Sequence, residues 1–233
     1  MSEGRDALVR ELREALLTGL RPFVAAGGAY ALIDFPNHSN VGDSAIWLGE
    51  LELFKQLTGR RPTYVCDFRN CDWDALAAID GPIFIHGGGN FGDIYPAHQA
   101  FREEVLRRFP GRRVIQLPQS LHYAHPDGLR RTADSIRSHG NFVLCVRDEN
   151  SRSIAEAFDC RTLLLPDSAF FLNLARRGRS THEVVYLHRT DSERVEEGVS
   201  LPAGWAEVDW LEEPKRPTRR HERLTALRGL GLR

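Results

Sequence analysis

Residues 35–44, FPNHSNVGDS, combine amide, imidazole and glycine residues where a strand should pass into a helix. The candidate ligand-binding residues of this segment are Asn37, His38, Asn40, Gly42 and Asp43. Asn and Gly favour a tight turn, and the N-terminus of the following helix attracts an anion. We expect Asp43 or Ser44 to cap that helix. Because the polar side chains exceed what a cap requires, the segment predicts a binding loop rather than a capped turn alone.

Residues 86–93, HGGGNFGD, follow an apolar run at 83–85 and place three glycines in succession. Consecutive glycines allow a ligand to approach the backbone closely. The dinucleotide fingerprint G-x-G-x-x-G fits here but lacks an acidic residue after the next strand, and the HGGG loop of lipases lacks its G-x-S-x-G partner. The segment therefore predicts an anion cradle, most commonly for phosphate, over a purely structural turn. The residues assigned to it are His86, Gly87, Gly88, Gly89, Asn90 and Asp93.

Residues 118–123, PQSLHY, form a third polar segment after a predicted strand. Gln119 and Ser120 offer neutral hydrogen-bonding groups. His122 is a candidate general acid, because an imidazole can donate a proton near neutral pH. This segment predicts substrate binding together with proton transfer.

Charged residues follow three further predicted strands. Arg147 is a candidate anion ligand, whereas Asp148 and Asp167 are equally candidates for helix caps. His188 and Arg189 could together hold a carboxylate or a phosphate. The combined set provides cations for an anionic substrate and amides for hydroxyl groups.

The composition excludes several classes of protein. The chain has 233 residues with a net charge of -1, so it lacks the basic surplus of a nucleic-acid-binding protein. It contains no apolar run of membrane-spanning length and no secretory signal, which predicts a soluble, cytoplasmic protein. Its four cysteines do not have zinc-site spacing, and we expect no metal. Lys55 and Lys215 are its two lysines, so a fixed cation in a site should be an arginine.

Apolar runs alternate with amphipathic segments through most of the chain. Strands are expected at residues 30–35, 63–66, 82–86, 113–117, 142–147, 162–165, 184–189 and 207–210. Helices are expected at residues 8–20, 44–57, 73–79, 97–109, 128–139 and 151–158. This alternation predicts an α/β fold with a doubly wound, mainly parallel sheet. Because ligands bind at the carboxyl ends of parallel strands, we expect the polar segments to meet at one edge of the sheet.

The composition changes after about residue 173, where arginine and proline become frequent. We expect a Rossmann-like α/β N-terminal lobe at residues 1–175 and a partial or appended second lobe at residues 176–233. The two strands expected in the second region are too few to enclose a core of their own.

The order and spacing of the polar segments resemble those of the polysaccharide pyruvyl transferase family. The matching stretches are residues 37–43, 86–93, 117–120, 147–148 and 166–167. The resemblance implies a fold like the two-lobed glycosyltransferase-B architecture. It also implies a bacterial exopolysaccharide enzyme that transfers pyruvate from phosphoenolpyruvate, its co-substrate, to sugar hydroxyls as a cyclic ketal with release of phosphate. No other cofactor is implied.

This resemblance also suggests roles for individual residues. The glycines of residues 87–89 would hold phosphate, Arg189 a carboxylate or phosphate, and His122 would be the acid. Asp43 or Asp93 would orient the hydroxyls of the acceptor, a glycan or a lipid-linked oligosaccharide. Such an acceptor implies a location at the inner face of the membrane, with peripheral association.

One family feature differs in this sequence. The family's second lobe carries an Arg-Leu-His segment that contacts the donor, whereas residues 223–225 read Arg-Leu-Thr. We therefore expect an incomplete second lobe, whose apolar surface would favour a homodimer. Two alternatives stay open: a nucleotide-sugar glycosyltransferase of the same architecture, and a catalytically silent binding module.

Overall fold

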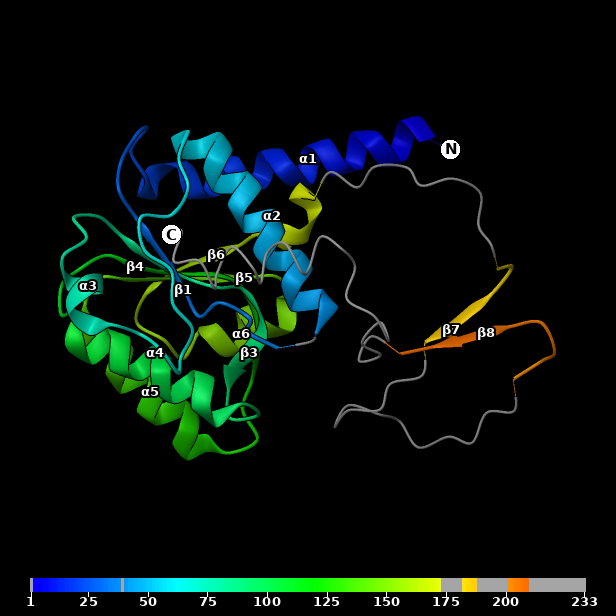
Figure 1. Ribbon diagram of the computed structural model, residues 1–233. Helices are drawn as coiled ribbons and strands as arrows, with labels where there is room; N and C mark the ends of the chain where they lie inside the picture. Colours follow the sequence, from blue (N-terminus) through cyan, green and yellow to red (C-terminus); the bar gives the residue numbers. More distant parts are fainter. Residues whose placement is uncertain (1, 39, 173–181, 188–200, 210–233) are drawn as a thin grey trace, which may run out of the picture. The chain divides into compact units, whose positions relative to one another are not determined.

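The computed structural model describes residues 2–38, 40–172, 182–187 and 201–209, and it divides the chain into two compact units (Figure 1). The first unit is Met1–Ala175 and the second is Arg176–Arg233. His188 and Arg189, two predicted site residues, lie outside the described residues. The polar segments before residue 172 all belong to the first unit.

A parallel sheet forms the centre of the first unit. Its strands lie in the order β1 (Ala31–Ile33), β2 (Ile83–Ile85), β4 (Val114–His122), β5 (Phe142–Val146) and β6 (Arg161–Leu164). β3 (Gly88–Gly92) pairs with the distal end of β4. A single bridge places Tyr64 beside β1, on the side away from β2. After β1 the chain passes to Tyr64 on one side of this strand and then crosses to β2 on its other side. The switch point of the topology therefore lies between β1 and β2.

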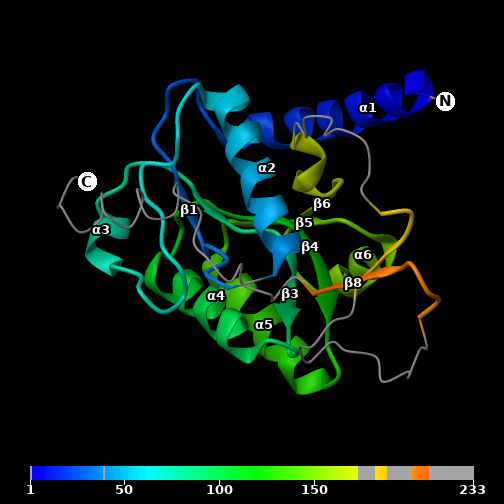
Figure 2. The ribbon, with the colours of Figure 1, turned by 45° about the vertical axis from the view of Figure 1, so that its right-hand side comes forward.

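Helices cover both faces of this sheet (Figures 1 and 2). α1 (Ser2–Leu20) and α2 (Val41–Thr58) pack against one face through a core that includes Leu16, Phe54 and Phe84. α3 (Trp73–Ala77), α4 (Pro96–Arg108), α5 (Pro126–His139) and α6 (Glu149–Ala155) contribute to the core on the other face. Alternate strand residues therefore enter separate cores, as in strands buried on both faces. The predicted α/β fold with a mainly parallel sheet is confirmed.

The structure differs from the sequence-based elements at two places near the glycine-rich segment. Residues 88–92, predicted as a loop, form β3, in which Gly88 and Gly92 have φ of +119° and +121°. β4 continues through the predicted loop at residues 118–122.

α2 begins at Val41 and is capped by Asn40, whose Oδ1 accepts the Gly42 N–H at 2.9 Å. The prediction of Asp43 or Ser44 as the cap was wrong, because the helix starts earlier.

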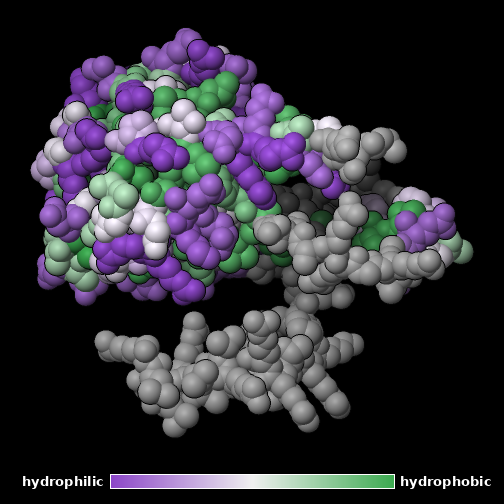
Figure 3. Space-filling model, turned by 90° about the horizontal axis from the view of Figure 1, so that it is seen from above, coloured by the Kyte–Doolittle hydropathy of each residue, from purple (hydrophilic) through white to green (hydrophobic). Residues whose placement is uncertain are grey.

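The described part of the second unit contains two short strands. β7 (Val185–Leu187) and β8 (Ala206–Val208) pair in parallel. β7 lies within the predicted strand at residues 184–189, and β8 begins one residue before the predicted strand at residues 207–210. Among the described residues of the whole chain, no helix is long and apolar enough to cross a membrane. Figure 3 shows polar and apolar residues interspersed over the visible face of the first unit.

Helix α2 also contacts a 3-10 helix, η2 (Ser168–Phe171), and this contact gives a first testable prediction. A Cβ at Gly49 would lie 2.0 Å from the Ser168 carbonyl oxygen, so the two backbones must separate. We expect Gly49→Ala to lower the free energy of unfolding by about 1–3 kcal/mol in urea denaturation. Gly4→Ala in α1, where a Cβ meets nothing within 4 Å, is the control and should not destabilise. An equal free energy of unfolding for Gly49→Ala and Gly4→Ala would contradict the close packing of Gly49 against Ser168.

Candidate active site

Asp34 follows β1 at the switch point and forms a buried pair with His98 of α4. The carboxylate oxygens of Asp34 lie 2.9 and 3.0 Å from His98 Nδ1. Asp34 is 1% exposed, whereas the His98 side chain is 14% exposed and packs against the Phe68 ring. The carboxylate fixes the tautomer with the proton on Nδ1, which leaves Nε2 to exchange a proton. This Asp–His pair is the arrangement of an oriented general acid or base.

Asp34 has a φ of +66°, the single positive φ of a non-glycine residue among those described. Asp tolerates this left-handed conformation better than most residues, yet it still costs free energy. The backbone turn comes directly after the buried strand β1. The strain therefore falls on the residue that holds His98.

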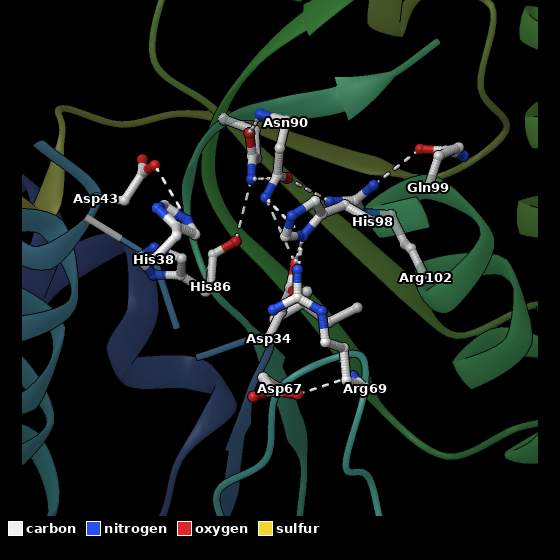
Figure 4. Close-up of polar contacts among 12 residues, drawn as sticks. Asp34, His38, Asp43, Asp67, Arg69, His86, Asn90, His98, Gln99 and Arg102 are labelled. Carbon is white, nitrogen blue, oxygen red and sulfur yellow. Dashed lines mark hydrogen bonds and ion pairs between the residues drawn. The ribbon is translucent and has the colours of Figure 1, made fainter. Parts of the chain in front are cut away.

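Asn90 of β3 links this pair to the interior of the sheet (Figure 4). Its Oδ1 accepts hydrogen bonds from Arg102 Nη2 and Gln119 Nε2, each at 2.9 Å. Its Nδ2 faces Asp34 Oδ2 at 3.5 Å. Two predicted site residues, Asn90 and Gln119, are thus brought together with the Asp34–His98 pair.

Glu50 of α2 binds the start of the glycine-rich segment, at His86 and Gly87. Glu50, at 0% exposure, accepts the Gly87 N–H through Oε1 at 2.8 Å and contacts His86 Nδ1 through Oε2 at 2.8 Å. The Asn90 N–H donates to Gln119 Oε1 at 3.1 Å. The predicted anion cradle therefore needs correction, because the Gly87 and Asn90 amides are bound within the protein.

Two glycines of the same segment lie beside charged side chains. A Cβ at Gly88 would be 3.1 Å from Asp43 Oδ1, and one at Gly89 would be 3.4 Å from Arg147 Nη2. The missing side chains allow these groups to approach β3 closely. The cation beside Gly89 is thus an arginine, Arg147, in line with the lysine-poor composition.

Burial acts to lower the pKa of His86, but the carboxylates around it, Glu50 foremost with Asp34 and Asp43, together raise it. Since the folded pKa exceeds the unfolded value of about 6.5, the stability from this pair is fully present below about pH 6.5. It is lost as the pH rises through the folded pKa. We expect the free energy of unfolding of the wild type to fall, relative to Glu50→Gln, as the pH rises above about 6.5. Parallel curves for the two proteins would contradict this assignment.

The polar residues before α2 chiefly organise the loop over β1. Asn37 Nδ2 donates to Asp67 Oδ2 at 3.0 Å. His38 Nε2 lies 3.6 Å from Asp43 Oδ2, and Figure 4 shows both side chains on the His86 side of the cluster. Burial lowers the pKa of His38, against the effect of the Asp43 carboxylate. With Asn40 used as the helix cap, His38 of the loop and Asp43 in the first turn of α2 form a partly exposed polar pair.

Arg147 joins the ends of β4 and β5 to the segment after β6. Its Nε donates to Ser120 Oγ at 2.9 Å, and its Nη1 donates to Asp167 Oδ2 at 2.6 Å. Ser120 Oγ in turn donates to Asp148 Oδ2 at 2.6 Å. Asp148 and Asp167 also cap α6 and η2, which confirms the capping alternative for both. Arg147 is thereby held in one orientation with Nη2 directed to Gly89.

Asp148 remains ionised in this network. Burial would raise its pKa, but hydrogen bonds from Ser120 and Ser151 outweigh burial and lower it. The negative charge of Asp148 therefore stays beside Ser120 and supports the orientation of Arg147.

Two predicted catalytic residues lie apart from the Asp34–His98 pair. Asp93 accepts the backbone N–H groups of Ala124 and His125 at 2.8 and 2.9 Å, and the Ala124 bond is the main cause of its lowered pKa. His122 is exposed at the end of β4, and it makes no side-chain hydrogen bond with any described residue. The structure therefore gives Asp93 a structural contact and does not bring His122 into the cluster.

Comparison with known proteins identifies the family of the chain. The family model described as "Polysaccharide pyruvyl transferase" matches residues 40–225. The chain belongs to the polysaccharide pyruvyl transferase family. "Pyruvyl transferase 1" of Schizosaccharomyces pombe is 34% identical over 192 residues, which are 76% of this chain and 48% of that protein. "Putative pyruvyl transferase EpsO" of Bacillus subtilis is 32% identical over 160 residues, which are 66% of this chain and 48% of that protein.

This member of the pyruvyl transferase family spans about half the length of the curated relatives that it matches. A third relative, "General stress protein 30" of Bacillus subtilis, is 25% identical over 83% of this chain and 58% of that protein. The matched region includes the glycine-rich segment, Asn90, Arg147 and α4. The resemblance noted from the polar segments is thus confirmed at the level of the family.

Sequence reasoning missed several residues of this candidate site. They are Asp34, Glu50, His98, Gln99, Arg102 and Gln116. A signal for two of them was available, because His98 and Arg102 have the i, i+4 spacing that places side chains on one helical face. Asp34 directly follows an apolar run, which is a second signal. Within the described residues, no group of three or more His, Cys, Asp and Glu side chains could hold a metal ion.

Proposed function

We propose that this chain is the donor-side part of an enzyme that transfers pyruvate from phosphoenolpyruvate to two hydroxyls of a glycan. The product is a cyclic ketal, and inorganic phosphate is released. The observation that carries the proposal is the Asp34–His98 pair, which flanks β3 together with Arg147 at the carboxyl edge of the sheet. A protonating group and a fixed cation are the two elements that this chemistry requires.

His98 is the proposed general acid. Its Nε2 gives a proton to the methylene carbon of phosphoenolpyruvate, which becomes a methyl group and leaves an electrophilic carbon next to the carboxylate. A first sugar hydroxyl adds to that carbon, and its proton returns to His98. Asp34 holds Nδ1 and stabilises the imidazolium form of the ring. This assignment replaces His122, which is exposed and outside the cluster.

The second half of the reaction breaks the bond between carbon and phosphate oxygen. Phosphate leaves with the bonding electron pair, a second hydroxyl of the same sugar adds to the carbon, and the phosphate carries away its proton. Arg147 with the backbone at Gly88 and Gly89 is the proposed phosphate site, since the guanidinium stabilises the charge on the leaving group. The sequence-based proposal that His188 and Arg189 hold a carboxylate or phosphate concerns residues outside those that the structure describes.

The acceptor is proposed to lie over the loop before α2. His38 and Asp43 form a polar pair beside Gly88, and a carboxylate can accept a hydrogen bond from a sugar hydroxyl. A glycan or lipid-linked oligosaccharide fits the family description, and we place the reaction in the cytoplasm at the inner face of the membrane. Phosphoenolpyruvate is the co-substrate, and no further cofactor is part of the proposal.

Phosphate release from phosphoenolpyruvate by the purified chain tests this function. We expect release that depends on a pyranoside acceptor, accompanied by an acceptor whose mass has increased by one pyruvate ketal. A nucleotide sugar in place of phosphoenolpyruvate should give no product. Transfer from the nucleotide sugar, or release of phosphate without any acceptor, would contradict the proposal.

A further inference from the structure

Arg102 of α4 is the largest fully buried side chain of the described structure, with 1% of its surface exposed. It donates from Nε to Gln116 Oε1 at 2.7 Å, and from Nη1 to Gln99 Oε1 at 2.8 Å. Its Nη2 donates to Asn90 Oδ1 at 2.9 Å, and its guanidinium lies over the Phe91 ring. All three acceptors are neutral amides. Within the described residues, no carboxylate lies within 4.0 Å of the guanidinium.

A buried charge without an ion-pair partner is costly, and a methionine or leucine of similar volume would avoid that cost. Burial lowers the pKa of Arg102, and the field of Asp34 acts in the opposite direction. The charge therefore interacts with the carboxylate that holds His98, although the two groups do not touch.

Asn90 is the physical connection between the two groups (Figure 4). Because its Oδ1 accepts from both Arg102 and Gln119, its Nδ2 must face the other way. That nitrogen lies 3.5 Å from Asp34 Oδ2 and 3.3 Å from His98 Nδ1. A rotated amide would direct its oxygen at the carboxylate and be repelled. The guanidinium thus sets which end of Asn90 meets the Asp34–His98 pair.

We infer that Arg102 is a positioning residue that acts through Asn90 to set the proton affinity of His98. The inference rests on the proposed function, in which His98 is the acid. Asn90 donates to Asp34, and the charge of Arg102 partly balances that of the carboxylate. Both effects weaken the hold of Asp34 on the imidazolium proton, which makes His98 a better proton donor.

Other charged and titratable groups act on the same cluster and stay unchanged in the test. His38, from the loop before α2, interacts electrostatically with His98 through their like charge when both are protonated. Glu103 of α4 and Tyr123 after β4 act on Arg102. None of these groups contacts Asn90, so a variant of Arg102 or Asn90 isolates the proposed link.

The experiment is an NMR titration of the His98 ring in the complete, ligand-free chain. We expect Arg102→Gln and Asn90→Ala each to raise the midpoint of the His98 titration by about half a pH unit or more. Arg102→Lys, which keeps the charge, should restore most of the wild-type midpoint. The matched control is Arg112→Gln. It removes a guanidinium that donates to three backbone carbonyls, of Gly81, Leu76 and Ile79, away from this site.

An unchanged His98 midpoint in Arg102→Gln and Asn90→Ala, with only lower thermal stability, would overturn the inference. A shift of the His98 midpoint in Arg112→Gln as large as that in Arg102→Gln would also overturn the inference. If Arg102→Gln does not fold, Asn90→Ala decides, since it leaves the guanidinium in place. The titration needs no turnover. A chain that fails to transfer pyruvate but shows the shifts would contradict the proposed function and keep the positioning role.

Discussion

His98→Gln is expected to lower kcat for acceptor-dependent phosphate release by about 100- to 10,000-fold. Glutamine keeps the volume and one N–H group toward Asp34, but it cannot donate a proton to carbon. The imidazole is the partly exposed member of a pair whose other member, Asp34, is buried. Since substrate contacts stay in place, the KM for phosphoenolpyruvate should change by less than about threefold. Steady-state kinetics with a saturating pyranoside acceptor measure both constants.

The matched control for this prediction is His125→Gln. His125 is exposed, and among the described hydrogen bonds it contacts Asp93 only through its backbone N–H. The kcat of His125→Gln should therefore stay near that of the wild type. His122→Gln discriminates between the two candidate acids. A large loss of kcat in His122→Gln, with His98→Gln near normal, would show that the exposed histidine at the end of β4 is the acid.

Arg147→Gln has the second largest expected effect. A hydrogen bond to a charged group contributes about 1.5–3 kcal/mol, so loss of the guanidinium should raise the KM for phosphoenolpyruvate about 10- to 100-fold. The kcat should fall as well, because the same cation stabilises the departing phosphate. Arg147→Lys should recover only part of the loss, since its ammonium cannot bind Ser120 and Asp167 as a planar fork.

Arg137→Gln provides the control for Arg147→Gln. Arg137 forms an exposed pair with Asp134 within α5, at 2.9 Å, and such pairs contribute little. Its kinetic constants should equal those of the wild type. Unchanged binding of phosphoenolpyruvate to Arg147→Gln by calorimetry would contradict the proposed phosphate site.

The sequence predicted the sheet well where strands are buried on both faces. The runs at 31–33, 83–85 and 142–146 consist mostly of β-branched, Leu and Phe residues, whose pattern is local. β3 could not be predicted in this way. Glycine has poor strand propensity, and residues 88–92 become a strand because they pair with residues 119–122 of β4, about 30 positions later in the chain.

The polar segments that follow strands identified the edge of the sheet at which the site lies, but not its most buried members. Asn37 and Asn40 were predicted to bind substrate and Asp93 to orient acceptor hydroxyls, yet their side chains form hydrogen bonds within the protein. His98 and Arg102 come from the interior face of α4. Their i, i+4 spacing is a local signal that both lie on one face of the helix, but their contacts with residues 34, 90 and 116 arise only in the folded chain and are contained in no local pattern.

The central claim is that the chain protonates the methylene carbon of phosphoenolpyruvate and forms a ketal on a glycan. The most direct measurement runs the reaction in D₂O and examines the purified acceptor by NMR. We expect a pyruvate ketal whose methyl group carries one deuterium, formed in equal amount to the released phosphate. An enolpyruvyl ether, a methyl group without deuterium, or no modified acceptor at saturating phosphoenolpyruvate would contradict it.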